Sequence, residues 1–354
     1  MRKVSLVLLV LFLISSIIAG CGGAQPEKPA ETAKEPEKAP EKAFVMKFAH
    51  SEPPGPQGPY TYYSEKFMEE INKRTNGRIK VELYPGGQLG GEQRVIQDVQ
   101  NNIAQATIVA VNNVTVYSPS MGAFDLPYMF TSVEDFDKVI KENRDLLNKK
   151  LEDEAGLIAL SWTQQHFRVL NNSKKPVKNI NDLKGLKIRV PQNPLQIAAF
   201  KSWNCEPAPI DWAETFAAVQ QKVVDGQENP YVSIYANKFH EITKYTTEIH
   251  YKLWVGPMVV NKEWFDALPQ DLQKAVIEAG LAAEKASNEF MGKLTEEAKD
   301  LLIKAGIEVY GAPDDEPIWV EKAMSVWPQF YDKIGDPFVL DSFLKTLGRE
   351  KPKA

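Results

Sequence analysis

Hydrophobic and polar residues alternate with two different spacings in the first part of the folded region. Short apolar runs at residues 44–50, 78–84 and 106–111 predict strands. Apolar side chains at three- and four-residue intervals predict helices at 58–75 and 92–102. This strand-helix order is typical of a mainly parallel sheet with helices on both faces, whose ligands bind at the carboxyl ends of the strands.

The same alternation begins again in the middle of the chain. Residues 157–162, 167–171 and 187–190 have the composition of strands, and residues 180–185 predict a short helix between the last two. A second α/β unit is therefore expected after the first.

Two longer helices are predicted beyond residue 210. Asp211 and Glu214 form a capping-box pattern that begins a helix expected to run to Asp225, where Gly226 would end it. Its amino end favours an anion.

A second helical pattern runs from Pro269 to about Ala305, roughly 50 Å at about 1.5 Å per residue. Such a helix is long enough to brace two domains. The alternative is a break into two helices at Gly280 or Gly292.

The amino-terminal residues have the pattern of a targeting segment. Two basic residues precede an apolar run at 4–18, shorter than the roughly 20 residues of a spanning helix, and Ala19 and Gly20 lead directly to Cys21. This ending resembles the bacterial lipobox, which implies a signal peptide at 1–20 and lipidation of Cys21. The alternative is an ordinary secretory signal with a cysteine near its cleavage site.

Residues 21–43 predict a flexible tether after the lipidated cysteine. They are rich in Ala, Pro, Glu and Lys and contain no aromatic residue, so they cannot bury enough apolar surface to offset chain entropy. The folded region begins at residue 44.

Composition excludes several classes of function. The whole chain is 43% hydrophobic and 25% charged, as in globular proteins, and its net charge of −5 with no basic block argues against nucleic acid as a partner. The four histidines are scattered, and Cys205 is the only cysteine after Cys21, so neither a metal site, a cofactor nor an intrachain disulfide is expected. A small molecule is the expected ligand.

Four segments resemble one known family in both sequence and order. They read Tyr-Pro-Gly-Gly-Gln-Leu-Gly at 84–90, Phe-Asp-Leu-Pro-Tyr at 124–128, Asp-Leu-Lys-Gly-Leu-Lys-Ile-Arg-Val-Pro at 182–191 and Val-Asp-Gly-Gln-Glu-Asn-Pro at 224–230. With them, the chain from residue 44 onward resembles the substrate-binding subunits of tripartite ATP-independent periplasmic (TRAP) transporters.

The resemblance implies an α/β fold of the periplasmic-binding-protein type. It has two domains with a ligand cleft between them, hinge strands that cross between the domains, and a long helix spanning both. On this basis the first domain is expected at 44–165 plus 255–294, and the second at 166–254 plus 295–354.

The resemblance also implies the site residues. The family's carboxylate-binding arginine corresponds to Arg189, a second cleft arginine to Arg168, a cleft asparagine to Asn229, and an aromatic residue that packs on the ligand to Trp212. Asn113, with its neighbour Asn112, is expected on a loop where it would bind ligand hydroxyls.

The residue types fit these roles, and each has a structural alternative. Arg189 lies in a predicted buried strand, where a guanidinium needs a partner; it would form two parallel hydrogen bonds to a ligand carboxylate, or a salt bridge within the protein. Arg168 would contact the ligand, or instead the protein at the hinge. The alternative for Asn229 is an Asx turn, and for Trp212 a place in the core.

Enzymatic sites are not predicted. The glycine-rich stretch 86–91 lacks the Gly-Lys-Ser/Thr ending of a phosphate loop, so it is interpreted as a strand-to-helix turn. Asp225 and Glu228 have no nucleophile or base assigned beside them and are interpreted as structural.

The sequence therefore predicts an extracytoplasmic, lipid-anchored solute-binding protein rather than an enzyme. Its ligand would be a small organic acid: a dicarboxylate, a hydroxy or keto acid, or a sugar acid. Ala110 stands where the sialic-acid branch of the family has glutamate, which argues against sialic acid. The expected partners are the small and large membrane subunits of a TRAP transporter. The alternatives are the binding component of another transporter, a sensor system, or a secreted lipoprotein enzyme.

Overall fold

The computed structural model describes residues 43–55 and 58–353. The predicted signal peptide and the predicted lipidation at Cys21 lie outside the described residues, as does the tether except for residue 43. None of the helices within the described residues combines the length and the apolar character needed to cross a bilayer.

The strands are β1 (Phe44–Ala49), β2 (Ile79–Tyr84), β3 (Ala106–Ile108), β4 (Leu157–Phe167), β5 (Val169–Asn172), β6 (Lys187–Val190), β7 (Glu206–Pro209), β8 (Gly226–Asn229), β9 (Tyr245–Thr247), β10 (Leu253–Asn261) and β11 (Glu308–Tyr310). The α-helices are α1 (Pro59–Thr75), α2 (Glu92–Gln100), α3 (Val111–Val114), α4 (Val133–Ala155), α5 (Pro194–Ser202), α6 (Trp212–Gln220), α7 (Tyr231–Ala236), α8 (Lys262–Asp266), α9 (Gln270–Lys304), α10 (Glu316–Met324) and α11 (Pro337–Leu347). Short 3-10 helices are η1 (Pro119–Asp125), η2 (Ile180–Leu183), η3 (Phe239–Glu241) and η4 (Trp327–Phe330).

The first lobe is built on a five-stranded sheet in the order β2-β1-β3-β10-β4. Strand β1 is parallel to β2 and β3, whereas β10 is antiparallel to β3 and β4. One apolar cluster packs α1, α8 and α9 with the sheet, and another includes residues of α2, α4 and α11. The predicted helical cover of both faces is confirmed.

The second lobe is built on a six-stranded sheet in the order β11-β9-β5-β8-β6-β7. Strand β6 is parallel to β7 and β8, but β5 is antiparallel to β8 and β9. The predicted two-sheet α/β fold is thus confirmed, and the first three strands β1, β2 and β3 are parallel as expected. Both sheets are nevertheless mixed, because β10 and β5 pair with their neighbours in the antiparallel direction.

The antiparallel strands arise because the chain passes from one sheet to the other and back. Strand β4 of the first sheet leads through Arg168 into β5 of the second, and the chain returns through Lys252 into β10. The two crossings are held together, since the Arg168 N–H donates to the Lys252 carbonyl at 2.9 Å. A strand that enters from the other lobe runs against its neighbours, which the local pattern could not predict.

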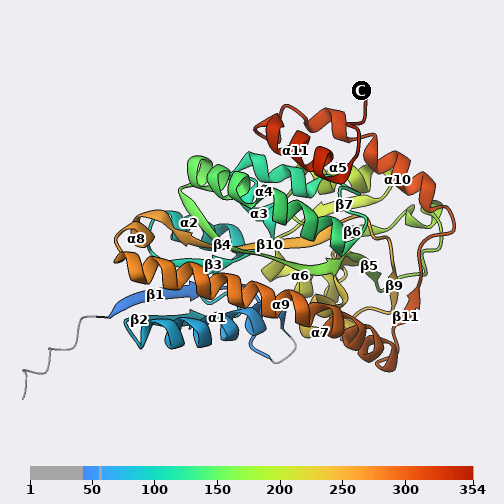
Figure 1. Cartoon of the computed structure of the whole chain (residues 1–354). Coiled ribbons are helices and arrows are strands. Elements are labelled where there is room, and N and C mark those ends of the chain that lie inside the picture. The colour runs from blue at the N-terminus through green and yellow to red at the C-terminus, as the bar shows by residue number, and fades with distance from the viewer. Residues whose placement is uncertain (1–42, 56–57, 354) are drawn as a thin grey trace, which may run out of the picture. The chain divides into compact units, whose positions relative to one another are not determined.

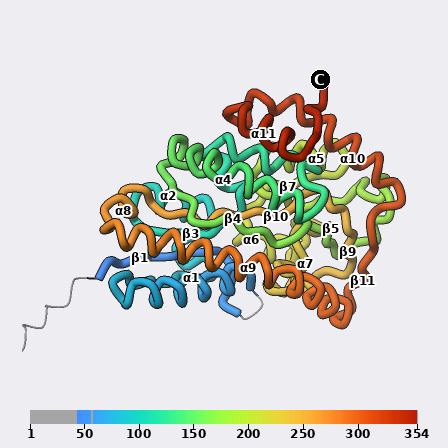
Figure 2. The backbone as a smooth tube through the Cα atoms, viewed as in Figure 1, coloured from blue at the N-terminus to red at the C-terminus, as the bar shows by residue number. Residues whose placement is uncertain are grey.

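Helix α9 spans both lobes as one unbroken helix of 35 residues (Figures 1 and 2). Its first half contributes Val276 and Ala283 to an apolar cluster of the first lobe, and its second half contributes Met291 and Leu302 to a cluster of the second. The predicted long helix is therefore confirmed, and the break considered at Gly280 or Gly292 is absent.

The two glycines of α9 predict opposite effects of the same substitution. A Cβ at Gly280 would lie 2.6 Å from the Leu160 Cβ and 2.9 Å from its carbonyl oxygen, whereas at Gly292 the nearest atom is 3.8 Å away. We expect Gly280→Ala to destabilise the fold by about 1–3 kcal/mol through overpacking. Gly292→Ala should stabilise it by up to about 1 kcal/mol through helix propensity. Urea unfolding of both variants checks this prediction. Equal changes in the unfolding midpoint would contradict the close contact between Gly280 and Leu160.

The carboxyl-terminal segment packs differently from the expected domain division. Residues 295–354 were expected in the second domain, but Phe343 of α11 and Trp327 of η4 belong to an apolar cluster of the first lobe. Helix α11 lies beside α4 (Figure 1). The Thr346 hydroxyl of α11 donates a 2.8 Å hydrogen bond to the Glu142 carboxylate of α4. The chain therefore returns to the first lobe after α10.

Two local expectations need correction. Helix α6 ends at Gln220 instead of reaching Asp225, and Gly226 begins strand β8 instead of ending a helix. Gly226 is paired with Asn172 and Ile188 on neighbouring strands, so the sheet sets its role. Asp211 does begin α6, because its side chain accepts a 2.9 Å hydrogen bond from the Ala213 N–H.

Candidate functional site

A polar cavity of about 590 Å³, counted with its opening to solvent, lies between the two lobes. Its walls come from α1, α2 and α3 of the first lobe and from β6, α6 and β8 of the second. All five residues predicted to bind ligand line it, namely Asn113, Arg168, Arg189, Trp212 and Asn229. The structure thus brings together residues that lie more than one hundred positions apart.

Arg189 presents an unpaired guanidinium to the cavity. It lies on β6, is only 3% exposed, and its Nε donates to the Ile210 carbonyl at 2.9 Å. Among the described residues, no carboxylate forms an ion pair with it and none accepts a hydrogen bond from its terminal nitrogens. The salt bridge considered as its alternative role is therefore not formed. Burial lowers the pKa of Arg189 to about 10, so the group remains a cation at neutral pH.

Trp212 positions this arginine. As the first residue of α6, it lies half-buried with its ring centroid 5.6 Å from the Arg189 guanidinium carbon and 5.5 Å from the Phe239 ring. A guanidinium over an aromatic face is held in place by cation–π attraction while its hydrogen-bond edge stays available. Trp212 is thus neither a core residue nor a freely exposed one.

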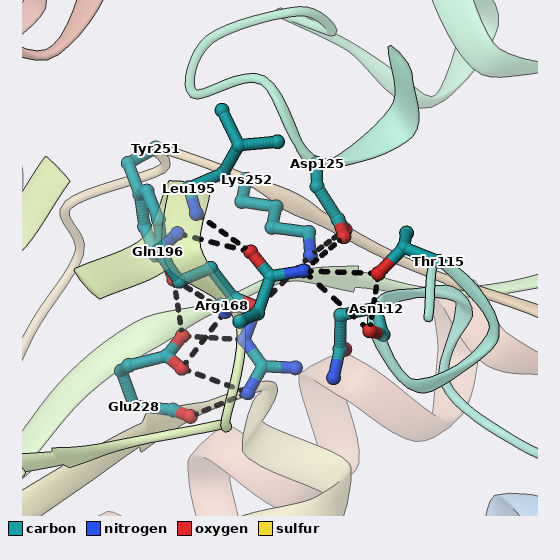
Figure 3. Close-up of polar contacts among 10 residues, drawn as sticks. Asn112, Thr115, Asp125, Arg168, Leu195, Gln196, Glu228, Tyr251 and Lys252 are labelled. Atoms are coloured by element: carbon teal, nitrogen blue, oxygen red, sulfur yellow. Dashed lines mark hydrogen bonds and ion pairs between the residues drawn. The ribbon is translucent and has the colours of Figure 1, made fainter. Parts of the chain in front are cut away.

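Arg168 is paired within the protein, as Figure 3 shows. It is 2% exposed, its Nε donates to one Glu228 carboxylate oxygen, and its Nη2 donates to the other at 2.9 Å and to the Glu228 carbonyl at 2.8 Å. Burial opposes its charge, but the charge of Glu228 and the hydrogen bond to it, with smaller contributions from Tyr251 and Asp125, together raise the pKa of Arg168. The hinge contact considered for Arg168 is therefore present, and Glu228 is structural as predicted.

A buried polar network extends from this pair to the first lobe (Figure 3). The Tyr251 hydroxyl donates to Glu228 at 2.9 Å and the Gln196 amide donates to Tyr251 at 3.0 Å. Lys252 forms an ion pair with Asp125 of η1, which also accepts a 2.7 Å hydrogen bond from the Asn193 side chain that caps α5. Buried charges persist when they are paired and hydrogen-bonded, so this network fixes the hinge beside the cavity.

Asn229 ends β8, next to the Arg168 pair. Its Nδ2 donates to the Gln227 side chain at 2.8 Å, and its residue is only 5% exposed. The Asx turn considered as its alternative is not formed, because within the described residues no backbone N–H donates to the Asn229 Oδ1. Its Oδ1 has no partner among the described residues and remains available in the cavity.

Glu92 organises the first-lobe wall. This buried first residue of α2 accepts from the Ser51 hydroxyl at 2.8 Å and the Tyr60 hydroxyl at 3.0 Å, and from the Ala110 N–H at 3.1 Å and the Asn113 amide at 2.5 Å. Four donors occupy the acceptor positions of the carboxylate. Burial nevertheless raises the pKa of Glu92.

Glu52 supplies a second buried carboxyl to the same wall. Its Oε2 accepts from the Tyr60 N–H at 2.8 Å and the Thr61 N–H at 3.3 Å, which serves as the N-terminal cap of α1 because Gly58 has no side chain. Burial raises the pKa of Glu52 to about 8, and the charge of Glu92 adds to the rise.

Asn112 and Asn113 lie on helix α3 and not on the expected loop. Asn112 is 3% exposed and lines the cavity, with no hydrogen bond to its side-chain amide among the described residues. The pattern missed this helix because it is only four residues long.

The two lobes approach closely at the mouth of the cavity. A Cβ added to Gly91, which precedes α2, would lie 2.9 Å from the Asp211 carboxylate of the second lobe. Asp211 also begins α6. The two lobes therefore meet at this point, and the lack of a side chain at Gly91 permits the close approach.

Sequence reasoning missed the acidic and amide residues of the first-lobe wall. Glu52, Glu92 and Gln165 line the cavity, but none belongs to a motif with recognisable chemistry. A weak signal was the position of Glu92 at the start of a predicted helix after a glycine-rich turn, where polar side chains face the carboxyl edge of a sheet.

A family model and several related sequences match this chain. The model of DctP, bacterial extracellular solute-binding protein family 7, matches residues 48–334. The 2,3-diketo-L-gulonate-binding periplasmic protein YiaO of Escherichia coli is 31% identical over 247 residues, which cover 70% of this chain and 75% of that protein. The C4-dicarboxylate-binding periplasmic protein DctP of Vibrio cholerae is 27% identical over 299 residues, covering 82% and 88%.

Solved structures have the same fold. A TRAP periplasmic solute-binding protein from Rhodobacter sphaeroides, in an apo open form, is 37% identical with a TM-score of 0.73, covering 86% of this chain and 99% of that one. The sugar acid binding protein DctPAm from Advenella mimigardefordensis, in complex with galactonate, is 27% identical with a TM-score of 0.81 and the same coverage of 86% and 99%.

Proposed function

Because the chain belongs to bacterial extracellular solute-binding protein family 7, the DctP family, we propose that it captures a small organic acid and delivers it to the membrane subunits of a TRAP transporter. The family comprises solute-binding proteins of transporters rather than enzymes, and its members act outside the cytoplasm. The observation that carries the proposal is the buried guanidinium of Arg189, which faces the cavity without a carboxylate partner.

The proposed mechanism involves binding and closure without covalent chemistry. An organic anion enters between the open lobes, and its carboxylate accepts two parallel hydrogen bonds from the terminal nitrogens of Arg189. Arg168, whose charge is balanced by Glu228, adds a further hydrogen-bond donor at the hinge through its Nη1. The lobes then close by rotation at the two crossings, which brings Gly91 to Asp211 and excludes water from the charge pair.

The ligands named for related proteins support an organic acid. YiaO is named for 2,3-diketo-L-gulonate, and the structure of DctPAm contains galactonate. Both molecules carry a carboxylate. The buried guanidinium of Arg189, which faces the cavity without a carboxylate partner among the described residues, supports a ligand of that class for this chain.

The proposal includes anchoring and domain organisation. Cys21 would carry the lipid after removal of residues 1–20, and residues 21–43 would tether the binding lobes to the membrane surface. The lobes would dock on the small and large membrane subunits and release the ligand there. The first domain would comprise 44–165 and 255–294 together with η4 and α11, and the second domain the remaining folded elements.

A thermal-shift experiment tests the binding function. The purified protein is unfolded and refolded to remove carried-over ligand, then melted with organic acids and with neutral sugars of matched size. Binding to the native state alone adds about 2.7 kcal/mol at a ligand concentration one hundred times the dissociation constant. We expect a higher melting temperature with carboxylates only. A shift with neutral sugars alone would refute the proposed role of Arg189.

A further inference from the structure

The charge balance of the cavity bears on how many carboxylates its ligand has. Arg168 is neutralised by Glu228, which binds it through both carboxylate oxygens. Arg189 has no such partner among the described residues. The cavity therefore offers one uncompensated guanidinium, which matches a single carboxylate.

The opposite wall disfavours a second carboxylate. Glu92 and Glu52 both belong to the first-lobe wall, and the donors around Glu92 are already engaged with it. Glu52, with its pKa raised to about 8, is largely protonated at neutral pH, whereas the four hydrogen bonds to Glu92 favour its charged form. A carboxylate placed against Glu92 would therefore meet like charge in a buried setting, and among the described residues no Lys or Arg of this wall lines the cavity to compensate it. Two carboxyl groups sharing a buried site cannot both ionise without a large energetic penalty.

The remaining polar atoms of the cavity suit hydroxyl groups. Within the described part of the chain, Asn113 and Asn229 each have their amide nitrogen engaged and Oδ1 unpaired, while Gln165 has its Oε1 engaged by Ser233 and Nε2 unpaired. Asn112 has both amide atoms available. A hydroxyl both donates and accepts, so it satisfies this mixture, whereas a carboxylate only accepts and would leave the asparagine oxygens unpaired.

We propose that the ligand is a hydroxylated monocarboxylate, with its carboxylate on Arg189 and its hydroxyl chain along Asn112, Asn113 and Asn229, and that the acidic wall at Glu92 rejects dicarboxylates. This inference rests on the proposed function and narrows it. The selection comes from the polarity of the cavity, positive on the second lobe and acidic on the first.

Matched ligand pairs test the proposal by titration calorimetry. Each aldonate is compared with the aldarate of the same stereochemistry, in which a carboxylate replaces the terminal CH2OH: erythronate with meso-tartrate, galactonate with galactarate, gluconate with glucarate. Hexanoate serves as a carboxylate without hydroxyl groups, and a zwitterionic amino acid as a carboxylate that carries a cationic group instead of hydroxyls. We expect the best aldonate to bind at least about tenfold more tightly than its aldarate and than hexanoate. The second carboxylate of the aldarate would meet the like charge of Glu92, and hexanoate would leave the asparagine oxygens of the cavity without a hydrogen-bond donor.

Two variants test which cavity residues are responsible for the preference for aldonates. Glu92→Gln should narrow the gap between the best aldonate and its aldarate, while the exposed control Glu69→Gln should leave it unchanged. If Glu92→Gln fails to fold, Asn113→Leu gives a second test, since it should weaken the aldonate at least about fivefold and leave hexanoate unaffected.

The outcomes separate this inference from the proposed function. Dicarboxylates or zwitterions that bind as tightly as the best aldonate would overturn the inference and leave an organic-acid receptor. Failure of every carboxylate to bind would overturn both.

Discussion

Replacing Arg189 with lysine should abolish most of the ligand binding and leave the fold intact. A lysine ammonium is a point charge that cannot make two parallel hydrogen bonds to a carboxylate, and the substitution also removes the contact between the guanidinium and the Trp212 ring. Loss of one partner of a buried charge pair costs about 2–5 kcal/mol, so the dissociation constant should rise roughly thirtyfold or more. Titration calorimetry with the best ligand of the thermal-shift screen measures the change.

An exposed arginine of the first lobe provides a matched control for Arg189→Lys. Arg94 of α2 has a 65% exposed side chain and pairs with Asp98 one turn on. Arg94→Lys makes the same chemical change without touching the cavity and should bind as the parent does. Parent-like affinity in Arg189→Lys would mean that the carboxylate is held elsewhere in the cavity.

Replacing Glu228 with glutamine should cause the largest loss of stability. The change keeps the side-chain volume but leaves the buried guanidinium of Arg168 without a counter-charge, and it disturbs the hydrogen bond from Tyr251. Breaking a buried ion pair in this way destabilises proteins by about 3–5 kcal/mol. Urea unfolding at neutral pH should show the midpoint falling accordingly.

A second substitution separates the charge effect from a packing effect. Adding Arg168→Met to Glu228→Gln removes the stranded cation and should restore part of the lost stability, because a buried pair replaced by apolar groups is often tolerated. The exposed pair Lys66 and Glu69 provides the control, where Glu69→Gln should leave the midpoint unchanged. If Glu228→Gln unfolds at the parental urea concentration, the pair does not hold the hinge.

The local elements follow closely from the chain's own pattern. Residues 58–75 were expected to be helical and α1 covers Pro59–Thr75; the long helix expected from Pro269 is α9. These elements depend on apolar spacing and on helix-starting residues, which are properties of neighbouring positions. The end of α6 was mispredicted because Gly226 is needed in the sheet, and no neighbouring residue reveals that.

The candidate site was accessible from the sequence only through residues with distinctive chemistry. Arg189 stood out because a charged residue in a buried strand requires a partner. Whether that partner is a protein carboxylate or a ligand depends on contacts between residues that are distant in the sequence, which the local pattern does not contain. The same holds for Arg168, whose counter-ion Glu228 lies sixty positions away and meets it only because β5 pairs with β8.

The sequence by itself determined the strands and helices, the long α9 and the arginines that point to an anionic ligand, because each is set by residue type and short-range spacing. Only the tertiary structure decided which arginine is neutralised, that α11 returns to the first lobe, and that Glu52 and Glu92 form an acidic wall opposite Arg189. Those properties depend on contacts between distant segments, since the charge and hydrogen-bonding capacity left in a cavity are known only after every buried group has found its partner.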